Sequence, residues 1–221
     1  MTCSAAAFVP WGIYSRWMLA HFANACHNST DGKFCGKLGG MGRTLYTSDT
    51  HIGHDKDFIV AARGHDTVAD HDRSILEHWK SHVTNEDTVV FGGDMLMGPD
   101  KLNRAAALLQ EMPYKTLHWI QGNHDPRFDK LQEMLPAGRD VHLYPMGTNP
   151  VINGRTVSHF PPGLIGVRPD DQRDFMKHAP AVEPGEFVHG HTHSTTAYAE
   201  HGDTKMHHVG WDSHHRFVEL P

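Results

Sequence analysis

Cysteine is scarce in this chain of 221 residues, and long apolar runs are missing. The three cysteines, Cys3, Cys26 and Cys35, are too few and odd in number for a disulfide framework, so a reducing cytoplasm is the expected location. No apolar stretch is long enough to cross a bilayer, and we therefore expect no membrane partner.

Positive charge is also in short supply. Lys and Arg number 20 against 26 Asp and Glu, which gives a net charge of −6 and no polybasic face. This balance argues against general binding to nucleic acid. A content of 38% hydrophobic and 21% charged residues is typical of a globular protein with one sizeable core. Histidine is the abundant exception, with 21 residues, and imidazole is the commonest metal ligand.

Residues 1–42 differ from the rest and are interpreted as an N-terminal extension to a domain over residues 43–221. A secretory signal is disfavoured, because no basic residue precedes the apolar part and Arg16 and His21 interrupt it. Two alternatives stay open for this extension. It forms a short amphipathic helix near Tyr14 to Asn24, or it is an upstream segment that precedes a true start at Met41.

From residue 43 onward, strand and helix patterns alternate. β-branched and aromatic runs predict strands over 44–47, 88–91, 117–120 and 141–144. Apolar residues at helical spacing predict a helix that Asp72 caps and that presents Ile75 and Trp79 on one face. A second helix is predicted from about Leu102 to Met112, and a short one over 127–136.

The second half of the chain is richer in strands. Asn153-Gly154 between two β-branched runs predicts a hairpin whose second arm reaches Pro161. A helical turn is expected around 172–177, and further strands are predicted over 186–188, 195–199, 205–209 and 216–220, the last three antiparallel. The order of these elements predicts an α/β sandwich with a mixed core sheet.

Polar residues follow the predicted strands at the points where the strands end. Seven of these residues are of types that commonly bind metal ions. These are Asp49, His51, Asp94, Asn123, His159, His191 and His193. Carboxylate and amide oxygens with four imidazoles suit borderline divalent ions such as Mn²⁺, Zn²⁺ or Fe. Seven ligands exceed what one four-coordinate ion needs, and they suit two ions about 3.5–4 Å apart that share a carboxylate. No cysteine takes part, which argues against a zinc-finger site.

In these residues the chain resembles the calcineurin-like metallophosphoesterase family, in its small bacterial and phage-type branch. The resemblance covers about residues 45–212 and rests on motifs in the family order: Asp49-Thr50-His51, Gly93-Asp94, Gly122-Asn123-His124-Asp125, His159 and Gly190-His191-Thr192-His193. It implies an α/β fold of four layers, an α/β/β/α sandwich with mixed β-sheets.

The resemblance also implies a role for each of these side chains. Asp49, His51 and His193 would hold one ion, Asn123, His159 and His191 would hold the second, and Asp94 would bridge the two. A hydroxide between the ions would attack phosphorus, while His124 assists the leaving group and Asp125 orients His124. The cofactors would be two divalent ions, Mn²⁺ first, with Zn²⁺, Fe or Ni²⁺ as alternatives. The substrate would be a small phosphomonoester or phosphodiester, with a nucleotide among the candidates.

Several interpretations remain open beside this one. His54 either touches substrate or is a solvated loop residue, and Arg127 either meets a phosphate oxygen or forms a surface salt bridge. The protein as a whole is alternatively a catalytically silent module for metal binding or protein interaction on the same fold. A third interpretation is a metallohydrolase that acts on a non-phosphate ester. The oligomeric state is left open.

Overall fold

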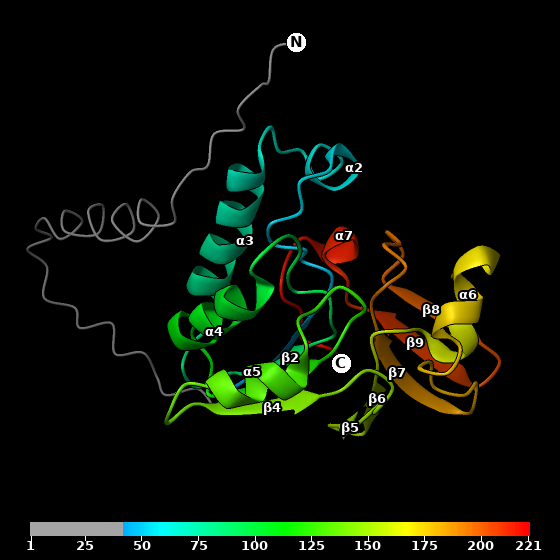
Figure 1. Ribbon diagram of the computed structural model, residues 1–221. Coiled ribbons are helices and arrows are strands. Elements are labelled where there is room, and N and C mark those ends of the chain that lie inside the picture. The colour runs from blue at the N-terminus through cyan, green and yellow to red at the C-terminus, as the bar shows by residue number, and fades with distance from the viewer. Residues whose placement is uncertain (1–41) are drawn as a thin grey trace, which may run out of the picture. The chain divides into compact units, whose positions relative to one another are not determined.

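The computed structural model describes residues 42–221, and Figure 1 shows their helices and strands. The predicted extension, with its expected helix near Tyr14 to Asn24 and the three cysteines, lies outside the described residues, apart from Gly42. Within residues 42–221, no helix combines the length and apolar character that a bilayer crossing needs.

Four parallel strands form the first sheet, in the order β1-β2-β3-β4. Their bounds are β1 Thr44–Thr47, β2 Thr88–Phe91, β3 Thr116–Ile120 and β4 Asp140–Tyr144. The predictions for residues 44–47 and 88–91 are confirmed without change, and the other two strands each begin one residue earlier. Since all four strands run the same way, their carboxyl ends lie at one edge of the sheet. This first sheet is wholly parallel, whereas a mixed core sheet was expected.

Of the helices between these strands, the two longest follow the predicted apolar spacing, and the short one over 57–60 lies where no helix was predicted. They are α2 Asp57–Val60, α3 Val68–His82, α4 Lys101–Glu111, α5 Phe128–Leu131 and the 3₁₀ turn η1 Gln132–Met134. The predicted cap of α3 was wrong. Thr67 is its N-cap and accepts the backbone N–H of Asp70, whereas Asp72 lies inside the helix and accepts the N–H of Gly53. Threonine and aspartate side chains can both accept a backbone N–H at a helix N-terminus. The residue types alone therefore did not distinguish Thr67 from Asp72 as the cap.

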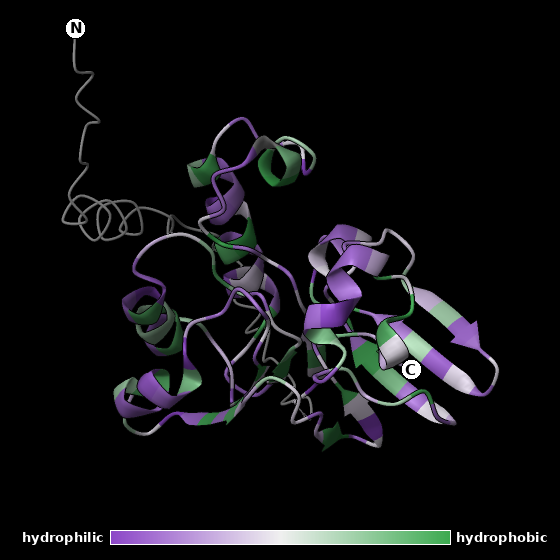
Figure 2. Ribbon diagram, turned by 45° about the vertical axis from the view of Figure 1, so that its right-hand side comes forward, coloured by the Kyte–Doolittle hydropathy of each residue, from purple (hydrophilic) through white to green (hydrophobic). Residues whose placement is uncertain are grey.

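One hydrophobic core joins α3 and α4 to the first sheet. Ile75 and Trp79 of α3 and Leu109 of α4 are fully buried against Phe91 and Trp119 of the strands. Alternation along each strand sends the remaining side chains to the opposite face of the sheet. In Figure 2 green and purple bands alternate along α3, as expected for a helix with one apolar face.

A second, mixed sheet has the strand order β5-β6-β7-β9-β8. Its strands are β5 Val151–Ile152, β6 Arg155–Val157, β7 Gly185–His189, β8 Tyr198–His201 and β9 Thr204–His208. The predicted hairpin at Asn153-Gly154 is confirmed, and both turn residues have positive φ (51° and 78°). Its second arm ends at Val157, well short of the expected Pro161, because the chain then leaves the sheet to present His159.

Two further expectations about the second sheet require correction. The segment 216–220 does not form a strand and instead makes one antiparallel bridge, between Tyr46 and Val218. β9 pairs with β8 in the predicted antiparallel hairpin but with β7 in parallel. A single strand can satisfy both neighbours because its two edges are independent, which a linear pattern does not reveal.

The two sheets pack face to face through a second apolar cluster. Tyr46, Val90 and Ile120 from the first sheet meet Val157 and Val188 from the second. The remaining elements are η2 Pro162–Leu164, α6 Pro169–Phe175 and α7 Trp211–His214. Phe160, Leu164 and Val167 form a small third cluster with Phe175 of α6. The protein is therefore an α/β fold with one parallel and one mixed sheet.

Candidate metal centre

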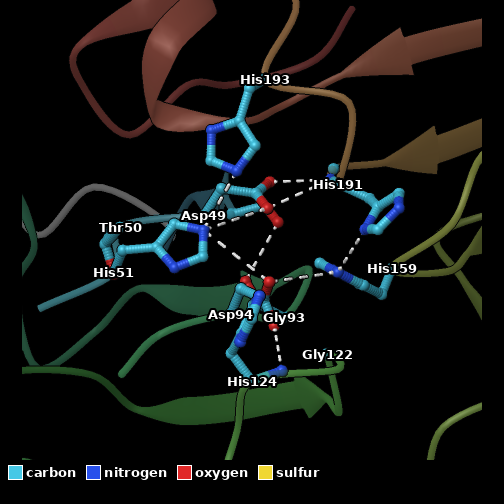
Figure 3. Close-up of polar contacts among 12 residues, drawn as sticks. Asp49, Thr50, His51, Gly93, Asp94, Gly122, His124, His159, His191 and His193 are labelled. Carbon is cyan, nitrogen blue, oxygen red and sulfur yellow. Dashed lines mark hydrogen bonds and ion pairs between the residues drawn. The ribbon is translucent and has the colours of Figure 1, made fainter. Parts of the chain in front are cut away.

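Every predicted ligand lies at a strand end, and the two sheets bring these ends together (Figure 3). Asp49 and His51 follow β1, Asp94 follows β2, and Asn123 follows β3 at the edge that parallel strands share. His159, His191 and His193 come from the second sheet, after β6 and β7. Loops held by a rigid scaffold in this way are a common place for binding groups.

Two groups of these side chains could hold a metal ion. Asp49, His51 and His193 form one group, and Asp49, Asp94 and His159 form the other; within each, the ligand atoms lie within 4.8 Å of one another. In the first group the Nε2 atoms of His51 and His193 are 3.2 Å apart. Imidazole nitrogen with carboxylate oxygen is a donor set for borderline divalent ions.

Asn123 and His191 extend the second group. The amide oxygen of Asn123 lies 3.1 Å from His159 Nε2 and 3.2 Å from His191 Nδ1, and these two ring nitrogens are 3.3 Å apart. The structure thus brings all seven predicted ligands into one cluster. His159, which has no distinctive motif around it in the sequence, is fully buried there.

The hydrogen-bond partners of two histidines show which ring nitrogen faces the middle of the cluster. His159 Nδ1 is 2.9 Å from the carbonyl oxygen of Gly92, and His193 Nδ1 is 2.7 Å from Asp212 Oδ2. These partner oxygens accept, so each Nδ1 carries a hydrogen, and Nε2 is the nitrogen that can bind a metal once it has lost its proton. A set of converging acceptors needs a cation between them, and the ligand chemistry therefore fits a divalent ion.

The pKa values of two buried histidines, His159 and His51, are shifted in opposite directions. Burial opposes protonation of His159, but the carboxylates of Asp94 and Asp49 outweigh it and raise its pKa to about 9. Burial lowers the pKa of His51 to about 3, which keeps that ring neutral and able to bind a metal. The cluster is thus one in which bound protons and bound metal compete for the same nitrogens.

Five of the seven ligands have a left-handed backbone. The φ angles are 56° at Asp49, 49° at His51, 54° at Asp94, 66° at His191 and 51° at His193. Each such residue costs roughly 1–2 kcal/mol relative to its ordinary conformation. Strain of this kind persists where the surrounding structure enforces it, and it collects at functional sites. Here backbone bonds between the loops enforce it, including Asp49 N–H to Gly93 O at 2.9 Å.

The expected role of Asp125 was wrong. Its carboxylate does not bind the ring of His124 but accepts the backbone N–H groups of Asp94, Met95 and Gly122 and the indole N–H of Trp119, at 2.8–3.0 Å. Asp125 therefore fixes the loop that carries Asp94. A sequence pattern cannot show this, because two of the donors lie 30 and 31 residues away.

His124 and His54 lie beside the ligand cluster. The ring of His124 is half-buried with its centre 5.6 Å from that of His51, and its backbone N–H donates to Asp94 Oδ1 at 2.8 Å. His54 is only 6% exposed, and its ring centre is 5.8 Å from that of His51. The solvated-loop interpretation of His54 was therefore wrong.

The ligand cluster opens into a cleft of about 640 Å³. Its walls include His124 and His191, Phe58 from α2, and Arg168 and Asp171 at the start of α6. Arg127 is not among the cleft residues. It is 78% exposed and pairs with Asp129 at 2.5 Å, which confirms the surface salt bridge and corrects the expected substrate contact.

Sequence reasoning missed two residues of the centre, Arg63 and Asp212. Asp212 binds His193 Nδ1, and Arg63 is buried with bonds to Asp212 and to the carbonyl oxygens of Asp49 and Thr50. A metal-binding histidine is expected to have a carboxylate or carbonyl partner. With 26 acidic residues in the chain, no sequence signal distinguishes Asp212 from the others.

Glycine is required at Gly122 and Gly190 because the backbone there passes very close to a ligand carboxylate. A Cβ on Gly122 would lie 2.2 Å from Asp94 Oδ1, and a Cβ on Gly190 would lie 2.1 Å from both Asp49 Oδ2 and Ser48 Oγ. These separations are far inside van der Waals contact. Glycine at both positions lets a loop pass directly over a carboxylate ligand.

Gly190→Ala is therefore expected to destabilise the protein by roughly 1–3 kcal/mol, the usual cost of overpacking a buried site. Thermal unfolding of the metal-free chain measures the effect. Gly92→Ala is the matched control and should cost less, since Gly92 also lies outside the left-handed region and a Cβ there would be 3.1 Å from its nearest neighbour, the Cβ of Ser48. A Gly190→Ala variant as stable as the unaltered chain would show that the site has room for a methyl group between Gly190 and Asp49.

Comparison with known proteins identifies relatives by sequence and one solved structure with a similar fold. The chain is 32% identical over 197 residues to the Gene 66 protein of Mycobacterium phage D29, covering 81% of this chain and 93% of that protein. It is 30% identical over 200 residues to the Gene 66 protein of Mycobacterium phage L5, covering 80% and 90%. No family profile matches the chain.

One solved structure shares the fold. A protein of unknown function from Aquifex aeolicus superposes with a TM-score of 0.52 at 18% identity, over 80% of this chain and 95% of that one. At this identity the likeness concerns the fold alone. The sequence relatives carry the assignment: at 32% identity over nearly the whole D29 protein, this chain belongs to the family of the mycobacteriophage Gene 66 proteins.

Proposed function

We propose that the protein is a dinuclear metal-dependent phosphoesterase. One observation carries the proposal: a single oxygen, Asp94 Oδ2, lies 3.7 Å from His51 Nε2 and 3.5 Å from His159 Nε2. These two histidines belong to different ligand groups. A carboxylate between two such groups is the arrangement that two neighbouring ions require.

The residues divide between the two ions as follows. Asp49, His51 and His193 hold one ion, Asn123, His159 and His191 hold the other, and Asp94 serves both. Asp49 lies within ligand distance of both groups as well, so the two buried carboxylates would balance half of the positive charge of two divalent ions. Mn²⁺ suits this mixture of oxygen and imidazole ligands best, with Zn²⁺, Fe or Ni²⁺ as alternatives.

When bound, the two ions supply Lewis acidity toward a phosphate group and make water acidic enough to attack phosphorus near neutral pH. The chain supplies the remaining functions. His124 lines the cleft beside His51 and is not needed as a ligand, which leaves its ring free to protonate or stabilise the leaving oxygen. With both ions bound, the positive charge of the centre would favour groups that bring negative charge into the cleft.

The size of the cleft supports a small substrate. At about 640 Å³ it has the size of a small-molecule site, and Phe58, 72% exposed, lies on its wall. We propose a small phosphomonoester or phosphodiester, acted on in the cytoplasm. Strained ligand residues around buried carboxylates favour a site for chemistry over a surface that only binds a partner.

The finer architecture belongs to the same proposal. We assign a four-layer α/β/β/α sandwich, in which α3 and α4 form one outer layer and the two sheets form the middle. The segment of α6 would contribute to the other outer layer. Its Phe175 packs on Phe160 at 4.9 Å between ring centres, and both rings contact the ligand His191.

The test combines metal analysis with hydrolysis. Protein purified without chelator should contain about two divalent ions per chain. With added Mn²⁺ it should hydrolyse p-nitrophenyl phosphate or bis-p-nitrophenyl phosphate, and the ratio of the two rates should indicate the substrate class. Prolonged chelation should abolish the activity, and Mn²⁺ should restore it. Hydrolysis of p-nitrophenyl acetate alone would indicate a metallohydrolase for other esters, and bound metal without turnover would indicate a silent metal-binding module.

A further inference from the structure

Arg63 is a buried cation that the proposed chemistry does not use. It follows α2 and is 8% exposed. A buried charge is costly unless all of its hydrogen-bonding groups are paired. Arg63 meets that condition fully, and the identity of its partners is informative.

All five N–H groups of the guanidinium have an acceptor. Nε and Nη2 donate to the two oxygens of Asp212 at 2.8 and 2.9 Å. Nη2 also donates to the carbonyl oxygen of Asp49 at 2.7 Å, and Nη1 donates to that of Thr50 at 2.9 Å. The fifth N–H, on Nη1, lies 3.0 Å from His71 Nε2, whose ring has its Nδ1–H directed at Asp72. A forked cation with five fixed donors matches this set, whereas an ammonium group does not.

Asp212 links Arg63 to a metal ligand. Its Oδ2 accepts both the Nη2–H of Arg63 and the Nδ1–H of His193, the latter at 2.7 Å. Because Nδ1 is occupied by Asp212, His193 presents Nε2 to His51, 3.2 Å away. The chain of contacts from Arg63 through Asp212 therefore sets both the tautomer and the direction of the His193 ring.

The two carbonyl contacts act on the other ligands of the same group. Asp49 and His51 have φ angles of 56° and 49°, and Thr50 lies between them. By binding the carbonyl oxygens of Asp49 and Thr50, Arg63 holds the peptide units that join these two strained residues. Arg63 thus supports every part of the ligand group formed by Asp49, His51 and His193.

The two histidines assigned to the other ion, His159 and His191, have rings that are held by different contacts. His159 donates to the carbonyl oxygen of Gly92, and the ring of His191 packs against both Phe160 and Phe175, with centres 4.7 and 5.2 Å away. The support of the cluster is therefore asymmetric. One half is organised by a buried arginine and the other by a carbonyl group and aromatic packing.

We propose that Arg63 is a positioning residue for one of the two ion sites, that of Asp49, His51 and His193, and acts there through Asp212 and the two backbone carbonyls. This inference rests on the proposed dinuclear centre. Its consequence is specific: loss of the Arg63 fork weakens one metal-binding step and spares the other. A residue that only stabilised the fold would not distinguish the two steps.

The experiment is a stepwise titration of the metal-free full-length chain with Mn²⁺, followed by calorimetry. The variants are Arg63→Lys, which keeps the charge and loses the fork, and Asp212→Asn, which leaves one acceptor oxygen and no negative charge where Arg63 and His193 now share two carboxylate oxygens. Each should weaken one step by about 10- to 100-fold, the usual effect of residues that orient ligands, and change the other less than about threefold. His193→Ala identifies which step belongs to this site.

Arg104→Lys is the matched control. Arg104 is also partly buried and donates to a loop carbonyl, that of Met97, but it binds no ligand residue. Both of its Mn²⁺ affinities should match the unaltered chain. Thermal unfolding of each metal-free variant checks folding, and because Asp212 is 18% exposed, Asp212→Asn decides the question if Arg63→Lys does not fold.

Two different failures are distinguishable. If the unaltered chain binds two Mn²⁺ ions and both variants weaken the two steps equally, or weaken neither, the positioning role is overturned while the dinuclear centre stands. If the unaltered chain binds no Mn²⁺, the dinuclear centre itself is overturned, and the role of Arg63 falls with it.

Discussion

His124→Ala is expected to lower kcat by about 10²- to 10⁴-fold while the metal content stays at that of the unaltered chain. The ring of His124 faces the cleft and is not part of either group that could hold an ion. Its one bond to the ligands is made by the backbone, whose N–H donates to Asp94 Oδ1. Alanine keeps that bond and removes only the ring.

The leaving group gives this prediction a sharper form. If the ring protonates or stabilises the departing oxygen, a poor leaving group should depend on it more than a good one. The loss in kcat should therefore be larger for an alkyl phosphate than for p-nitrophenyl phosphate. Steady-state kinetics with Mn²⁺ on both substrates, beside elemental analysis of each preparation, measures it.

Arg127→Ala provides the comparison from the same loop. That side chain is exposed and paired with Asp129, so its removal should change kcat less than about twofold. Loss of the bound ions from His124→Ala would show that His124 is a ligand. An equal loss for both substrates would show that the ring acts on the phosphate group and not on the leaving oxygen.

The strands and ligand loops could be predicted because their signals are local. Residues 44–47 and 88–91 are short β-branched and aromatic runs, and each is followed at once by small and acidic residues that end the strand. In a parallel sheet such ends meet at one edge, so placing the strands also placed Asp49 and Asp94 together. The Asn153-Gly154 hairpin was predictable for the same reason, since its turn chemistry is contained in two residues.

The supporting residues could not be predicted because their partners are distant in the chain. Asp125 binds backbone groups 30 and 31 residues away, and Arg63 binds Asp212 across 149 residues. Each contact depends on which loops face each other after folding, and the residue types involved occur many times in the sequence. The same reason explains the parallel pairing of β7 with β9, since a strand pattern does not specify the direction of its neighbour.

Asp125 shows how a local inference can fail even inside a strong motif. Its adjacency to His124 suggested that one side chain orients the other. Adjacent side chains in a tight loop point in different directions, and the carboxylate instead turns inward to four N–H donors. Burial, and after it the charge of Asp94, raise the pKa of Asp125 to about 7, against the effect of these donors.

Asp94→Asn is expected to weaken both Mn²⁺ steps by more than about 100-fold, beyond the range for residues that only orient ligands. The reason is geometric: one oxygen faces His51 of one group and His159 of the other, at 3.7 and 3.5 Å. An amide at this position removes a negative charge that both ions would share. The measurement is the same two-step titration of the metal-free chain, with elemental analysis of protein purified without chelator.

Asp212→Asn is the matched substitution, because it exchanges the same atoms at a carboxylate that contacts one group alone. A shared ligand should affect both Mn²⁺-binding steps, whereas a positioning residue should affect one. Comparing the two variants therefore distinguishes these roles without a measurement of activity. The fold should survive Asp94→Asn, since the amide oxygen of the new side chain can still accept the N–H of His124, and the backbone bond to Asp125 does not involve the altered group. Two tightly held ions in Asp94→Asn would show that Asp94 is not shared, and Asp49, within reach of both groups, would then be the carboxylate that joins them.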